Sequence, residues 1–383
     1  MSIMTISTPP SDPRDTYPVN IDLAFKRPLV GKKLVAGSTR IEGKLWVTQS
    51  SSPLSATDQV YYDAVTGLNG MFSEIKENFS KIGSLEPYGH YSRGVKMRAQ
   101  MTQGGNVGLD TRSAAAGRCP NSSIAQAYLR GRTAAEPNIP FSIYPEIATN
   151  QMNGNASSDA LGEINTTFTI CPVSQFLFGA TVDSNTNFYL TDVLLLCDVV
   201  DDDGSRVPIT MEYTASRQGV LESNEFNFET KVSGIADSCH LSFINAANQN
   251  TASQNYLACP PPPGIPPIGY SGSIVPSGYG LERAQFGLNS TDTVFTNYIL
   301  ESREAFLRAG VDSYNGSNNY KTKLSDLRDP VYPDGYITGM NFGAGVDLRK
   351  NMFGVVLESQ ADTTDANRTA FFVYFRMIME LVA

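Results

Sequence analysis

The stretch TAFFVYFRMIMELV at Thr369–Val382 carries the strongest fold signal in the sequence. One set of alternate positions is apolar throughout: Phe371, Val373, Phe375, Met377, Met379 and Leu381. The other set consists of Phe372, Tyr374, Arg376, Ile378 and Glu380. A period of two is typical of a β-strand. Because both faces carry large apolar side chains, we expect this strand to tie the C-terminal part of the chain into the core of a sheet.

Other strand-like runs occur along the chain. Four of them, at 141–147, 164–170, 175–180 and 188–200, are bounded by Pro, Asn, Gly or Asp, and a further strand is predicted at 353–359. Residues 91–99 are also predicted to form a strand. Leu68, Phe72, Ile75 and Phe79 recur at helical spacing, which predicts a helix over 67–80, and a second helix is predicted at 299–309. Many short strands with few helices favour antiparallel sheets. The sequence therefore predicts an all-β protein with a few short helices and one jelly roll in each half.

The chain divides at Asp201-Asp202-Asp203-Gly204, a turn signal between two strand-like runs. A calcium loop of the EF-hand type would begin at Val199, where an acidic ligand is required, so the spacing fails and a turn is predicted. Prolines near the start predict an extended N-terminal arm over 1–33. The two halves are then predicted at 34–203 and 204–383.

Composition excludes several classes of function. The 383 residues carry a net charge of −9, and only 17% are charged. This balance argues against attraction of the whole surface to nucleic acid. No apolar run approaches the length of a membrane span. Five scattered cysteines without a C-x-x-C motif indicate reduced thiols and maturation in a reducing compartment.

One segment departs from the acidic balance. Residues 93–132 contain seven arginines and lysines against the single acid Asp110. They could form a patch that meets nucleic acid, lipid headgroups or an acidic neighbouring subunit. Solvated faces and ordinary ion pairs are the preferred interpretation. Four tyrosines in predicted loops could either form an interface or seal the loops against the sheets: Tyr270, Tyr279, Tyr314 and Tyr320.

The sequence shows no catalytic constellation. The two histidines, His90 and His240, lie in no paired metal-binding spacing. Cys239 and His240 are adjacent, so on a strand they point to opposite faces and cannot act as nucleophile and base. We expect a buried Cys239 beside a half-exposed His240. No catalytic, cofactor-binding or metal-binding residue is therefore named, no cofactor is expected, and the protein is predicted not to be an enzyme.

The order of aromatic and turn motifs along the chain is more informative than any single motif. The succession is RIEGKL at 40–45, YYD at 61–63, GSLE at 83–86, YSRGVKM at 91–97, FSIYP at 141–145, FG at 178–179, FYLTDVL at 188–194, GYITGMNF at 335–342, VDL at 346–348 and FFVYF at 371–375. It resembles the capsid proteins of the lineage shared by tailless bacteriophages and adenoviruses. Within that lineage, the double jelly-roll major capsid proteins of virophages and polinton-like viruses are the most similar.

The resemblance implies two jelly rolls side by side and a homotrimer with a pseudo-hexagonal outline. Such capsomers assemble with other capsid proteins into an icosahedral virion shell, without membrane insertion or direct binding of nucleic acid. A pentameric penton protein at the capsid vertex remains an alternative. From other classes, a carbohydrate-binding jelly-roll module and a glycoside hydrolase with paired carboxylates also remain open.

Overall fold

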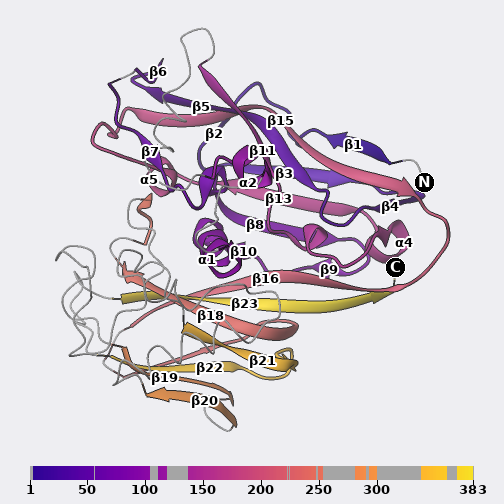
Figure 1. Ribbon diagram of the computed structural model, residues 1–383, viewed down its shortest axis with the longest axis vertical. Helices are drawn as coiled ribbons and strands as arrows, with labels where there is room; N and C mark the ends of the chain where they lie inside the picture. Colours follow the sequence, from indigo (N-terminus) through magenta and orange to yellow (C-terminus); the bar gives the residue numbers. More distant parts are fainter. Residues whose placement is uncertain are drawn as a thin grey trace.

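The computed structural model describes residues 3–103 except 56, together with 111–118, 137–221, 223, 225–246, 249–252, 281–289, 293–299, 338–359 and 369–382. These residues form two β-sandwiches that lie side by side (Figure 1). The chain passes once from the first sandwich to the second, between β15 and β16. The two marked chain ends lie at the same end of the molecule (Figure 1).

The first sandwich consists of two antiparallel sheets. Sheet A is built on four strands that lie in the order β1 (Met4–Thr8), β15 (Thr186–Asp201), β5 (Arg40–Gln49) and β11 (Asn138–Ile143). Sheet B has the order β3 (Asp22–Arg27), β13 (Ile164–Ile170), β8 (Phe72–Phe79) and β10 (Tyr88–Gly89). Alternate residues of these strands point into the space between the sheets, so the period of two is visible in their burial.

The second sandwich has the same construction. Sheet D has the order β16 (Pro208–Val220), β23 (Thr369–Val382), β18 (Ile235–Asn245) and β21 (Thr338–Asp347). Sheet E has the order β17 (Glu225–Thr230), β22 (Phe353–Ser359), β19 (Leu281–Leu288) and β20 (Thr293–Ile299). Phe371 and Phe353 lie in the core between these sheets.

Both sandwiches share one strand connectivity. The eight strands named above for each roll can be counted in chain order. In both rolls the first strand then pairs with the last, the last with the third, and the third with the sixth. In the facing sheet, the second main strand pairs with the seventh, the seventh with the fourth, and the fourth with the fifth. This is the order of a jelly roll, in which two Greek keys form two facing sheets. The predicted all-β double jelly roll is therefore confirmed.

The first 33 residues do not form a separate arm. β1 pairs with β15 in sheet A, and β3 pairs with β13 in sheet B. They are the first and second strands of the first jelly roll, so this roll begins well before residue 34. The prolines of this segment lie mainly between its strands, in connections where a missing backbone N–H disrupts no ladder.

The predicted helix over 67–80 is wrong. A 3₁₀ turn at η1 (Gly67–Met71) leads directly into β8. The register of β8 against β13 shifts between Thr169 and Ile170, so that Phe72 and Ile75 both face the core although they are three residues apart. This irregularity shifts the alternation of buried and exposed residues by one position. The apolar residues of β8 therefore have a spacing like that of a helix.

The predicted strand over 91–99 is a helix, α1 (Tyr91–Gln103). Most of its described side chains are buried, on all sides of the helix, because α1 lies between the two sandwiches (Figure 1). A helix that is buried all round has no solvent-facing stripe, so its sequence lacks the usual helical period. Gly94 allows α1 to approach β10, since an added Cβ would lie 2.3 Å from the Tyr88 hydroxyl.

The remaining elements are short connections: β2 (Tyr17–Pro18), β4 (Lys32–Leu34), β6 (Ser52–Pro53), β7 (Tyr61–Tyr62), β9 (Gly83–Ser84), α2 (Thr111–Ala115), η3 (Ala148–Asn150), β12 (Ala156–Ser157), α4 (Ser158–Leu161), α5 (Val173–Phe176) and β14 (Leu177–Phe178). Three predicted strands, 164–170, 353–359 and 369–382, match the structure to the residue. Ile299 ends a strand, whereas residues 300–309 of the predicted helix and the four loop tyrosines lie outside the described residues. Within the described part of the chain, no helix combines the length and apolarity needed to cross a membrane.

Candidate functional site: the junction between the two jelly rolls

In sheet D of the second roll, the first half of β23 is buried on both faces. The Phe371 face of β23 belongs to the second core, whereas Phe372 and Tyr374 on the other face belong to the same apolar cluster as the core of the first roll. All three side chains are at most 1% exposed. The last strand of the chain therefore joins two cores, and its burial holds the rolls together.

The segment that leads into α1 forms the first-roll side of this contact. The Arg93 guanidinium lies 4.8 Å from the centre of the Phe372 ring, and the His90 ring packs edge-on against Phe372 at 4.5 Å. The Tyr374 hydroxyl donates a hydrogen bond of 3.2 Å to the His90 carbonyl. His90 has a φ of 48°, an unfavourable backbone conformation for a residue with a Cβ. These contacts fix α1 against the outer face of sheet D.

Backbone pairing fixes the edge of sheet D to the first roll. Met152 forms an isolated antiparallel bridge with Met211 of β16. The Glu212 amide donates to the Gln151 carbonyl at 3.1 Å, and the Asn153 amide donates to the Thr210 carbonyl at 3.1 Å. The first roll thus adds a short strand-like segment to the second roll. Paired β-edges have a defined register, so this contact sets the relative position of the rolls.

An ion pair crosses the junction beside this edge. Arg217 of β16 contacts the Glu86 carboxylate at 2.8 Å, and the Ser233 amide donates to the same carboxylate at 3.0 Å. Partial burial by itself would raise the pKa of Glu86. The hydrogen bonds from Arg217 and Ser233 outweigh this effect and hold the pKa below its usual value.

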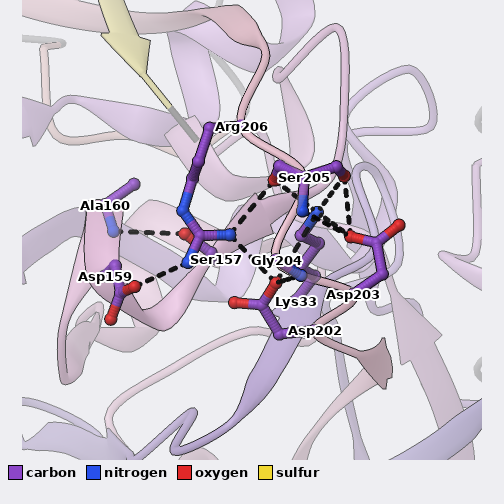
Figure 2. A network of polar contacts seen from close by, with 9 residues as sticks. All are labelled: Lys33, Ser157, Asp159, Ala160, Asp202, Asp203, Gly204, Ser205 and Arg206. Carbon is purple, nitrogen blue, oxygen red and sulfur yellow. Dashed lines mark hydrogen bonds and ion pairs between the residues drawn. The ribbon is translucent and has the colours of Figure 1, made fainter.

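The linker between the rolls is held by a charged network (Figure 2). The Lys33 ammonium of β4 contacts the Asp203 carboxylate at 2.6 Å and the Ser205 carbonyl at 2.8 Å. Arg206 contacts Asp202 at 3.0 Å and Asp159 of α4 at 2.6 Å. Hydrogen bonds from Lys33 and Ser205 lower the pKa of Asp203. The acidic segment is therefore a linker held by ion pairs, which the prediction of a simple turn did not include.

The basic segment at 93–132 does not form a surface patch in its described part. Lys96 pairs with Asp63 at 2.9 Å, and both side chains are largely buried. Arg98 donates to Gln151 at 2.7 Å, Arg112 lies 4.3 Å from the Tyr144 ring centre, and Arg118 contacts Glu146 at 3.8 Å. The preferred interpretation as ion pairs is correct for Lys96 and Arg118, although these pairs are internal rather than solvated. Arg98 instead bonds to a neutral amide, and Arg112 is exposed. Arg130 and Arg132 lie outside the described residues.

The surroundings of Glu146 show that part of this basic segment lies in the interior of the molecule. Burial raises its pKa, and the nearby charges of Arg98 and Arg118 offset the effect only in part. The Tyr91 hydroxyl accepts a hydrogen bond of 3.0 Å from the Glu146 amide. Arg98 of α1 and Arg118 after α2 thus place positive charge beside a carboxylate inside the molecule.

A cavity of about 330 Å³ opens at the junction. Its lining comes from both rolls: Ser73, Glu74, Gly89, His90, Ser92, Arg93, Thr169, Gln175, Gln249, Asn250, Thr251 and Ala252. The Gln175 amide donates to Asn250 at 3.1 Å across this space. The cavity brings solvent to the His90 side of the junction.

The described residues contain no cluster of His, Cys, Asp or Glu that could hold a metal ion. Cys239 is buried in the second core, where burial raises the pKa of its thiol, and it therefore lacks the character of a nucleophile. His240 points to the opposite face, as predicted for adjacent strand residues. It is only 2% exposed, however, so the expectation of a half-exposed histidine is wrong.

The junction residues were not identified from the sequence. Arg93, His90 and Glu86 lie far from Phe372 and Arg217 in the chain, and no local motif connects them. One signal was available: the two apolar faces of β23 require two different partners, since a strand at the surface of a sandwich needs only one apolar face. That pattern points to a second packed layer without showing which segment supplies it.

No known protein family matches the sequence, and no curated protein does. Solved structures do match the fold. The Faustovirus major capsid protein superposes with a TM-score of 0.63 at 11% identity, covering 100% of this chain and 90% of that chain. PBCV-1 VP54, as fitted into a reconstruction of the virophage Sputnik, gives a TM-score of 0.60 at 8% identity, with 99% and 94% covered. The mavirus major capsid protein gives 0.53 at 8% identity, with 98% and 86% covered.

This chain has their double jelly-roll fold. At such low identity the likeness concerns the fold alone. It extends over both rolls and therefore includes their arrangement side by side.

Proposed function

We propose that the protein is the major capsid protein of an icosahedral virus and that it is structural rather than enzymatic. The observation that carries this proposal is the pair of jelly rolls with one shared strand order, packed side by side. Solved proteins that superpose along nearly the whole chain are described as major capsid proteins. In the proposed virion the chain lies in the capsid shell, after assembly in a reducing host compartment.

The proposed assembly unit is a homotrimer with a pseudo-hexagonal outline. Two similar rolls per chain give three chains six similar corners, and a closed ring requires each interface to repeat by symmetry. In this proposal residues 34–203 and 204–383 are the two jelly-roll halves, and residues 1–33 complete the first. Contacts with other capsid proteins, and not with nucleic acid, then build the shell.

The test is the native mass of the purified full-length protein, combined with negative-stain images of the same sample. Trimers with a pseudo-hexagonal outline are expected. Closed pentamers would replace the proposal by the penton alternative. A protein that stays monomeric at high concentration would overturn both and would favour the carbohydrate-binding module, which a glycan-binding screen would then test.

A further inference from the structure

The 383-residue chain contains two histidines, and both lie on the side of sheet D that faces the first roll. His90 belongs to the first roll and packs against Phe372 of the second at 4.5 Å. His240 lies on β18, directly opposite Tyr374 of β23. Since Cys239 and Leu241 face the second core, His240 lies on the face of sheet D that also carries Phe372 and Tyr374. Both histidines thus lie on the outer side of sheet D, where His240 is buried and His90 is partly buried.

We propose that these two histidines make the junction an acid-sensitive latch, which is closed when both are neutral and opens when they become protonated. Burial and a neighbouring arginine, Arg93 for His90 and Arg376 for His240, disfavour a protonated ring in the closed junction. The inference concerns the junction within one chain and does not depend on a role in a capsid.

The surroundings of His90 oppose a positive charge. Burial and then the neighbouring Arg93 lower its pKa, while a hydrogen bond with Gln218 of β16 and the charge of Glu74 on β8 act in the other direction. Arg93 is only 4% exposed and lies over the same Phe372 ring, so it cannot move away easily. The cavity lined by His90 gives protons a path to this site.

The surroundings of His240 oppose a positive charge more strongly. Burial, followed by the charge of Arg376, lowers its pKa to about 3. Arg376 of β23 pairs with Glu212 of β16 and with Asp237 of β18, the latter at 3.0 Å. These two carboxylates contact Arg376, and Arg376 is the charged group that acts on the His240 ring. In an opened junction the ring would be hydrated and would regain an ordinary pKa of about 6.5.

The sign of the pH effect follows from linkage. A histidine whose pKa is lowered in the closed state binds more protons in the open state, so acid favours opening. Between pH 6.5 and 5.5 the opening constant should rise by about fivefold for each histidine that stays neutral when closed and becomes free when open. Ordinary carboxylates titrate mainly below this range. Burial raises the pKa of Glu146 and of Asp237 in the closed state, so these two groups act in the opposite direction where opening frees them.

The test is hydrogen exchange of the full-length protein at pH 7.5, 6.5 and 5.5, corrected for intrinsic exchange rates. The relevant amides are those of Glu212 and Asn153, which bond across the junction. Their protection should fall by about fivefold to thirtyfold between pH 6.5 and 5.5. Amides between β8 and β13, inside the first roll, serve as the internal reference and should not change over this range.

Two substitutions separate the effect of histidine protonation from the other effects of acid on the protein. His90→Asn tolerates the positive φ, and His240→Gln keeps a polar side chain of similar length. Each should remove part of the loss of protection in acid, and the double variant should show no such loss between pH 6.5 and 5.5. Unchanged pH dependence in the double variant, or constant protection in the wild type, would overturn the latch.

A second measurement keeps the proposal testable if His240→Gln does not fold. In the wild-type protein labelled at histidine, NMR titration should show both rings with a pKa below 6.5 in the folded state. A ring that titrates near 6.5 without loss of folded signals would contradict its part in the latch.

Discussion

The last strands of the two jelly rolls, β15 and β23, occupy equivalent positions but have different surroundings. Along β15 buried residues alternate with exposed or half-exposed ones, because the outer face of sheet A carries side chains such as Tyr189 and Lys44 toward solvent. Along β23 the five residues from Ala370 to Tyr374 are all buried. The same topology thus supports one sheet with a free face and one sheet between two layers. The outer face of sheet D, rather than its strand order, makes the two rolls one body.

The largest effect is expected from Phe372→Ala. It removes the ring that contacts His90 and Arg93, and truncation of a buried phenylalanine typically costs about 3–5 kcal/mol. The matched control is Tyr189→Ala on β15, whose half-exposed ring stacks on Trp46 at 5.7 Å. Its loss should cost about 1 kcal/mol. Urea unfolding of both variants measures the difference, and equal losses would show that the outer faces of the two sheets are equivalent.

This contrast also separates what the sequence could show from what it could not. The apolar alternation of β13, β22 and β23 is local, so their bounds were predictable to the residue. β8 and α1 were misassigned because their patterns of apolar residues depend on packing partners that are distant in the sequence. An irregular pairing with β13 shifts the phase of β8, and burial between two rolls removes the polar stripe of α1. Residues 1–33 were misassigned because an edge strand such as β1 carries little apolar signal of its own.

The candidate site was less predictable than the fold. Its basic residues were recognised as a group, but their partners Asp63, Gln151 and Glu146 come from other segments. Spatial pairing of this kind requires the tertiary fold. The acidic turn at 201–204 was correctly placed between the two rolls, whereas its ion pair with Lys33 was not foreseen.

A moderate effect is expected from Lys33→Met at the linker. The Lys33 side chain is 8% exposed, and its ammonium bonds to Asp203 and Ser205. Its removal leaves these groups without their partner and should lower the unfolding free energy by about 1–2 kcal/mol. The adjacent Lys32→Met is the control, because its pair with Asp201 is more exposed, at 26% and 73%, and should change stability by less than about 0.5 kcal/mol.

Thermal unfolding of the two lysine variants side by side distinguishes the network from simple charge removal, since both lose one positive charge. A larger loss for Lys32→Met would mean that the linker network does not hold the two rolls together.

The smallest effect is expected from Glu86→Gln, which weakens the ion pair with Arg217 across the junction. The pair is partly exposed, so its loss should cost no more than about 1 kcal/mol at neutral pH. The pKa of Glu86 is lowered from 4.5 in the folded state, so its contribution is present above pH 4.5 and disappears as the pH falls through the lower folded value. The stability of wild type and variant should therefore converge in acid.

The matched control lies on the free face of the first roll. Asp192 contacts Lys44 at 2.7 Å with side-chain exposures of 65% and 46%. Asp192 has a φ of 52°, which asparagine tolerates well, so Asp192→Asn removes the charge with little backbone cost. We expect its effect on urea unfolding to stay below about 0.5 kcal/mol at every pH. If Glu86→Gln behaved in the same way, the ion pair with Arg217 would not contribute measurably to stability. Apolar burial at Phe372 and the edge pairing at Met211 would then account for the contact between the rolls.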